Sequence, residues 1–127
     1  MRDLYSNIGV RLALKPAVAS AAANGESVDL HGFNRVSLAV NTGAIAGDGD
    51  FGIKLQESDS GSSNWTDVAA DQVDTNAPTT LEADSAYKLG YRGFKRFIRP
   101  VLTKAGGTSI AIGAVALLGD AASRPVA

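Results

Sequence analysis

The alternation that decides the fold is clearest in FIRPVLTKAGGTSIAIGAVALLG, residues 97–119. In its first half Ile98 and Leu102 share one face of an extended chain, because side chains in a strand alternate between two faces. Ala105, Gly106 and Gly107 supply a turn, since glycine adopts turn conformations at little steric cost. The apolar run at 108–118 is typical of a strand that is buried on both sides.

Working outward, the same period-two pattern recurs in several other segments of the chain. It is strong in Val36 to Asn41, Phe51 to Gln56 and Tyr87 to Tyr91, and weaker in Ile8 to Leu14 and Val28 to Leu30. We expect a loose hairpin connection over residues 41–50 and a hairpin turn near Tyr91 to Gly93. The sequence therefore predicts an all-β protein, a single antiparallel β-sandwich of jelly-roll type with about seven to eight strands.

The ends of the chain carry weaker signals. Pro16 is expected to end the first strand, because proline cannot donate a ladder hydrogen bond. Residues 16–23 have a helix-like composition, but we prefer an extended or coiled segment because two turns of isolated helix are marginal. We expect one domain over 1–127, with residues 1–7 as a flexible N-terminal arm and residues 120–127 as a loose tail.

Composition excludes several classes of protein. The chain has no cysteine, so disulfides, thiolate nucleophiles, zinc ribbons and iron–sulfur clusters are ruled out. Its net charge of −1 gives no general attraction to nucleic acid or to anionic lipid. The longest nearly apolar stretch, Ile110 to Gly119, is too short to span a bilayer. The first residues do not have the pattern of a secretory signal, so we expect synthesis in the cytoplasm and no membrane partner.

Candidate catalytic and metal-binding residues are few. His31 is the single histidine, and no nucleophile-elbow motif accompanies it, so we prefer a turn histidine to a catalytic one. The carboxylates of Asp48, Asp50, Glu57 and Asp59 invite a calcium hypothesis, but their spacing differs from an EF-hand loop and favours solvated turn residues. No glycine-rich phosphate-binding fingerprint is present. We therefore expect no enzyme activity, no cofactor and no metal.

Charge is distributed unevenly along the chain. Residues 48–84 contain nine acids and one base, Lys54. The basic residues that follow are interleaved with aromatic ones; they are Lys88, Arg92, Lys95, Arg96, Arg99 and Lys104. Such a segment could bind single-stranded RNA, dock on protein or simply be solvated. We prefer protein docking, because Tyr87, Tyr91 and Phe97 fit inward strand positions and arginine is favoured at interfaces. Trp65 is expected to anchor its polar loop to the domain.

Several strand-and-turn phrases resemble a family of small structural proteins of tailed phages and prophages. The phrases are Val28 to Phe33, Phe51 to Asp59 with Trp65 to Val68, Tyr87 to Thr103, and Leu118 to Asp120. Together they cover roughly residues 24–126. Some members of that family are similar to head decoration or cement proteins, which bind the outside of the capsid shell.

The resemblance implies a non-enzymatic virion protein on the capsid surface, made in the bacterial host. Its implied partners are the major capsid protein and other copies of itself, as a dimer or trimer, but not nucleic acid. The candidate contact residues are Arg2, Tyr5, Arg92, Lys95, Arg96 and Arg99. Two alternatives stay open: a tail or head–tail connector component, and a carbohydrate-binding or host-surface-binding module on the same kind of sandwich.

Overall fold

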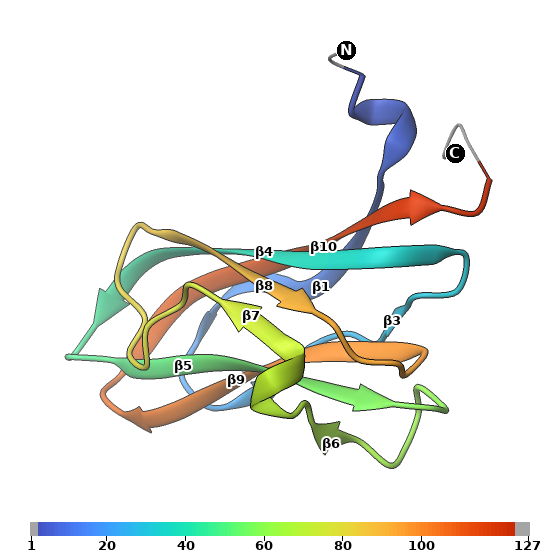
Figure 1. Ribbon diagram of the computed structural model, residues 1–127. Helices are drawn as coiled ribbons and strands as arrows, with labels where there is room; N and C mark the ends of the chain where they lie inside the picture. Colours follow the sequence, from blue (N-terminus) through green and yellow to red (C-terminus); the bar gives the residue numbers. More distant parts are fainter. Residues whose placement is uncertain (1–2, 124–127) are drawn as a thin grey trace.

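The computed structural model describes residues 3–123 as two antiparallel β-sheets packed face to face (Figure 1). The first sheet has the order β1 (Gly9–Ala19), β10 (Ser109–Ala121), β4 (Phe33–Ala46), β8 (Ala86–Tyr91), β7 (Val73–Thr75). The second sheet contains β2 (Ala23–Asn24), β3 (Val28–Asp29), β9 (Phe97–Gly106), β5 (Asp50–Ser58) and β6 (Thr66–Asp67), with β2 and β3 both beside β9. Two short 3-10 helices, η1 (Tyr5–Asn7) and η2 (Ala70–Gln72), complete the described elements. The all-β sandwich prediction is confirmed.

The strand order is that of a jelly roll. The sheet β1-β10-β4-β8 faces the sheet β2/β3-β9-β5-β6, and strands near the two ends of the chain, β1 and β10, are neighbours. The added strand β7 extends the first sheet beyond β8. Gly25 separates β2 from β3, and a Cβ there would lie 2.5 Å from the carbonyl oxygen of Ala13. Glycine at this position lets β1 approach the second sheet.

The core lies between the sheets and takes its side chains from both. Leu38 and Ile110 of the first sheet and Phe51, Ile98 and Leu102 of the second are fully buried. Each such side chain stabilises the fold by about 1.5–3 kcal/mol through removal of apolar surface from water. The inward positions are those that the alternation of residues 97–118 indicates.

Both hairpin predictions are wrong. β4 and β5 lie in different sheets, and so do β8 and β9, so the chain crosses from one sheet to the other at residues 47–49 and again at 92–96. Alternation reveals that a segment is a strand but says nothing of its partner, because a hairpin and a crossover between sheets bury the same faces. The segment at 92–96 is consequently a loop at one end of the sandwich.

Three further expectations are corrected. β1 continues through Pro16, because it is an edge strand with register shifts on either side of Leu14, where proline needs no ladder partner. β10 is buried on one face only: Val115 and Leu117, on its other face, are half-buried. At the C-terminal end, β10 includes Asp120 and Ala121, so the strand extends into the segment expected to be a tail.

A flexible N-terminal arm is not confirmed. Residues 5–7 form η1, in which the Asn7 amide donates a hydrogen bond to the carbonyl of Leu4. The Asp3 carboxylate accepts a hydrogen bond from the Ser6 amide and helps to close this turn. Figure 1 shows the segment leading away from the two sheets, close to the end of β10.

Candidate functional site

The loop at residues 92–96 lies at one end of the sandwich and is fixed by Tyr91. The Tyr91 hydroxyl donates a hydrogen bond of 2.7 Å to Glu57 Oε1 and accepts one of 2.9 Å from the Lys95 amide. Burial, together with the bond to the Glu57 carboxylate, raises the pKa of Tyr91 well above its usual range. A Cβ at position 93 would lie 2.5 Å from two carbon atoms of the Tyr91 ring, so Gly93 allows the loop to fold closely over that ring.

Three ion pairs hold the basic side chains of this loop. They are Arg92 with Asp74, Lys95 with Asp59, and Arg96 with Asp29. The last pair is bidentate, with Arg96 Nε and Nη2 each 2.8 Å from an oxygen of Asp29. Hydrogen bonding from Arg96 lowers the pKa of Asp29 to about 2. Two of these partners, Asp59 and Asp74, come from the acidic segment 48–84, and they pair with basic residues of the segment that follows it.

Arg99 lies elsewhere, on the outer face of the second sheet. Its Nε and Nη2 both donate to Gln56 Oε1, and its guanidinium carbon lies 4.4 Å from the Trp65 ring centroid. Gln56 in turn donates to Asp67, which also pairs with Lys54. These bonds lower the pKa of Asp67, with the bond from Gln56 as the largest cause. Trp65 is half-buried and stacked on Arg99, consistent with its expected role as an anchor.

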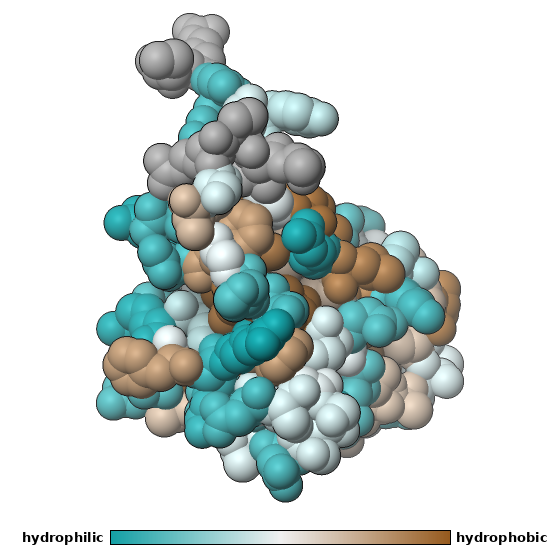
Figure 2. Space-filling view, turned by 90° about the vertical axis from the view of Figure 1, so that its right-hand side faces the viewer, coloured by the Kyte–Doolittle hydropathy of each residue, from teal (hydrophilic) through white to brown (hydrophobic). Residues whose placement is uncertain are grey.

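Phe94 projects from the loop tip and is 92% exposed, the most exposed of the large apolar side chains among the described residues. Beside it lies a cleft of about 430 Å³ at this end of the sandwich. Its apolar lining comes from Leu30, Phe33, Val36 and Phe94, and its polar lining includes His31, Asn34, Arg35, Lys95 and Arg96. Figure 2 looks onto this end and shows hydrophobic residues gathered in its upper half with hydrophilic residues around them.

The two N-terminal contact candidates are Arg2 and Tyr5. Arg2 lies outside the described residues. Tyr5, in η1, is 87% exposed, and its neighbour Leu4 is 65% exposed. Exposed apolar side chains of this size are common singly, but two adjacent ones on a projecting segment suit contact with another surface.

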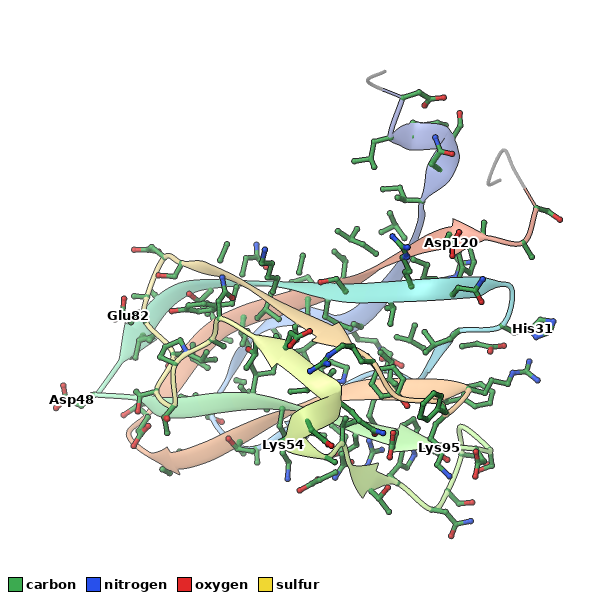
Figure 3. All side chains as sticks on the ribbon, viewed as in Figure 1. His31, Asp48, Lys54, Glu82, Lys95 and Asp120 are labelled. Atoms are coloured by element: carbon green, nitrogen blue, oxygen red, sulfur yellow. The ribbon has the colours of Figure 1, made fainter. Side chains whose placement is uncertain are left out.

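The histidine and carboxylates considered for catalysis or calcium are not gathered into one site. His31 lies in the turn before β4, where its amide donates to Asp29 Oδ1. Asp48 lies at the opposite end of the sandwich from His31 and Lys95 (Figure 3). Asp59 is paired with Lys95, so it lies far from Asp48. Within residues 3–123 no group of three or more His, Asp or Glu side chains is arranged to hold a metal ion.

The residues that line the cleft bear on whether it could carry out acid–base catalysis. Of the described residues that line it, one is a histidine, His31, and none is Asp or Glu. General acid–base chemistry of the two-carboxylate kind therefore has no pair of groups there. The described part of the chain contains no helix with the length and hydropathy to cross a membrane. No protein-family model and no curated protein matches the chain.

Sequence reasoning found the basic side chains of the loop but missed Phe94 and the cleft. A hairpin turn near Tyr91 to Gly93 would begin the next strand at Phe94, whereas β9 begins only at Phe97. Gly93 and Lys95 are the signals that could have marked a loop, because glycine and, to a lesser degree, lysine are depleted in strands. The cleft depends on the crossover between sheets, which alternation does not reveal.

Proposed function

We propose that this chain is a non-enzymatic structural protein that binds the outer surface of a phage capsid and stabilises the shell. The main observation in favour of a protein-binding role is the exposure of Phe94. This large aromatic side chain is almost fully exposed, on a loop that is fixed at both ends. The capsid as partner is supported by the resemblance of the strand phrases to phage head proteins. A jelly roll is also an architecture that recurs in viral capsid proteins.

The energetics favour Phe94 as an anchor. Burying a phenylalanine side chain in a partner contributes about 1.5–3 kcal/mol, which corresponds to roughly 10–150-fold in affinity. The ion pairs of Arg92, Lys95 and Arg96 and the hydrogen bond to Tyr91 already order the loop. Little conformational entropy is then lost on binding, as in preorganised interfaces.

The basic residues have a different role in this proposal. Each of Arg92, Lys95 and Arg96 is paired with a carboxylate of the same chain, yet all three pairs are at the surface. They can set orientation and register against a polar rim of the partner, but they do not present a strongly cationic patch. For the same reason they are poorly suited to neutralise phosphates, which disfavours the nucleic-acid hypothesis.

The decisive experiment measures occupancy of purified capsids from the phage or prophage that encodes the chain. Phe94→Ser is the test variant, because its side chain is 92% exposed and its removal disturbs little of the fold. Val18→Ser is the matched control, because Val18 is an apolar side chain that is 72% exposed on β1. We expect Phe94→Ser to lose at least tenfold in affinity and Val18→Ser to change it less than twofold.

Equal capsid occupancy by Phe94→Ser and the wild type would show that Phe94 is not part of the contact. No binding of the wild type to capsids would refute the capsid as partner. A reconstruction of the virion that locates the chain on the tail or the connector would favour that alternative. Reversing the four charges at 92, 95, 96 and 99 is a weaker test. It breaks internal bonds to Asp74, Asp59, Asp29 and Gln56, so lost binding would not identify a contact.

The cleft favours a second candidate, a carbohydrate-binding or host-surface-binding module. Its volume of about 430 Å³ lies in the range of small-ligand sites, and Phe94 beside it could stack on a sugar ring. The Trp65 ring is covered by the Arg99 guanidinium, so Trp65 does not stack on a sugar in this arrangement. Glycan-array binding that Phe94→Ser abolishes, with no capsid occupancy, would select this alternative.

A further inference from the structure

The cleft at the end of the sandwich has two walls, and hydrogen bonds hold both in place. One wall is the turn before β4, and the other belongs to the loop at residues 92–96. The Leu30 amide donates a hydrogen bond of 2.8 Å to the carbonyl of Arg96, which joins the two walls. The Ala122 amide donates one of 2.9 Å to the carbonyl of Gly32, which ties the turn to the chain that follows β10. Ligand sites are usually largely formed before the ligand binds, and these bonds give the cleft that property.

The apolar part of the lining offers a surface on which a side chain can be buried. Leu30, Phe33 and Val36 are half-buried and pack against the hydrophobic core, so the fold itself sets their positions. Phe94, at the loop tip, adds exposed aromatic surface beside them. A volume of about 430 Å³ is at the small end of ligand sites and suits a short peptide segment.

The charged part of the lining is cationic. Its charged residues are Arg35, Lys95 and Arg96. The ion pairs of Lys95 and Arg96 are short, with N–O distances of 2.9 Å and 2.8 Å, so carboxylates of the same chain largely neutralise these two cations. Arg35 differs, because its Nε lies 4.0 Å from Asp120 Oδ2, beyond hydrogen-bonding distance, and its side chain is 83% exposed. Arg35 is consequently the cation of the cleft best placed to bind an added anion.

We infer that the cleft binds a short segment of a partner protein in which an apolar side chain stands next to a carboxylate. The apolar side chain packs on Leu30, Phe33 and Val36. The carboxylate pairs with Arg35, whose planar guanidinium can donate two parallel hydrogen bonds to it. The inference rests on the proposed function for the statement that the partner is a protein. It adds the chemistry of the bound segment, and it adds Arg35 to the contact.

Two other classes of ligand match the lining less well. Sugar hydroxyl groups need acceptors as well as donors, whereas arginine and lysine side chains are donors only. A phosphate group is held best by several donors together, and Lys95 and Arg96 already donate to Asp59 and Asp29. One loosely paired arginine beside an apolar surface matches one carboxylate beside an apolar group.

Two-dimensional NMR of the isotope-labelled chain tests the inference with blocked peptides as probes. The first probe is an acetylated and amidated tetrapeptide with leucine followed by aspartate between two alanines. The second has asparagine in place of the aspartate, and the third has alanine in place of the leucine. We expect the first probe, titrated to about 10 mM, to shift the amide signals of residues 30–36 and 93–96 with a millimolar Kd. The other two should bind more weakly by about threefold or more, because one loses the ion pair and the other loses apolar contact.

Arg35→Gln removes the guanidinium and keeps most of the side chain. It should weaken the aspartate probe by about threefold or more and leave the asparagine probe within about twofold, because the lost interaction is with the carboxylate. Lys15→Gln is the matched control. Lys15 is an exposed cation whose ion pair with Glu26 is also long, at 3.6 Å, and it does not line the cleft, so both probes should bind as to the wild type. Arg35 is 83% exposed, so the variant should fold, and a urea titration checks this.

Loss of selectivity for the carboxylate would overturn the inference. Equal binding of the aspartate and asparagine probes, full binding by Arg35→Gln, or no shift of the cleft amides by the first probe would each do so. Shifts of the same amides by N-acetylglucosamine, with none by the peptides, would assign the cleft to the carbohydrate candidate and would also overturn it.

Capsid occupancy separates this inference from the proposed function. Selective binding of the aspartate probe by a chain that occupies no capsid would uphold the chemistry of the cleft and refute the shell as partner. Capsid occupancy that falls in Phe94→Ser but not in Arg35→Gln would keep the proposed function and overturn the inference. Loss of occupancy in both variants, with Lys15→Gln unchanged, would support the two together.

Discussion

Replacing Tyr91 with phenylalanine removes one oxygen atom at the point where the loop at 92–96 is fixed. Tyr91 is 8% exposed, and its hydroxyl makes two hydrogen bonds, one to the Glu57 carboxylate and one from the Lys95 amide. A hydrogen bond to a charged group contributes about 1.5–3 kcal/mol, and a neutral one about 0.5–1.5 kcal/mol. Water can reach Lys95 and partly replace the second bond. We therefore expect Tyr91→Phe to lower the free energy of unfolding by about 2 kcal/mol.

Urea denaturation followed by the fluorescence of Trp65, the single tryptophan, measures this change. A chain of this size has an m-value of about 1–3 kcal/mol/M in urea, so the midpoint should fall by about 1 M with the slope unchanged. A double-mutant cycle with Glu57→Gln isolates the pair, and we expect a coupling of about 1 kcal/mol. Hydrogen exchange at the Lys95 amide should accelerate in Tyr91→Phe. A destabilisation below about 0.5 kcal/mol, or unchanged exchange at Lys95, would refute the role assigned to the hydroxyl.

Three further predictions concern other parts of the fold. Gly25→Ala should destabilise the chain by about 2 kcal/mol or more in urea titration, because the new Cβ would overlap the carbonyl of Ala13, and an unchanged midpoint would contradict that close approach. Asp29→Asn should cost about 0.2–1 kcal/mol at pH 7, because the surface ion pair with Arg96 is lost. The pKa of Asp29 is lowered from 3.8 to about 2, so this contribution is present above pH 4 and disappears as pH falls through about 2; a difference between wild type and variant that persists at pH 1.5 would count against it. Arg99→Ala should change the fluorescence of Trp65 by removing the stacked guanidinium, whereas an unchanged emission spectrum would argue against the stack.

The alternation of apolar residues predicts which segments are strands and which of their faces are buried, and this part of the fold was predictable from the sequence. Ile98 and Leu102 are buried as expected, and the segments that contain them are strands. Alternation could not pair the strands, because a jelly roll joins consecutive strands across two sheets and buries the same residues as a hairpin would. The prediction that Pro16 ends the first strand was wrong, because the effect of proline depends on whether the strand is central or at an edge. That position is a property of the assembled sheet.

The basic residues of the candidate site were predictable from the sequence, but the exposure of Phe94 and the electrostatics of the site were not. The cations at 92, 95 and 96 were found, yet their partners Asp74, Asp59 and Asp29 are far from them in sequence. Uneven charge along a chain predicts a charged patch only if the two signs stay apart after folding. Here the crossover at 92–96 brings the signs together, and what remains exposed at the loop tip is the aromatic side chain of Phe94.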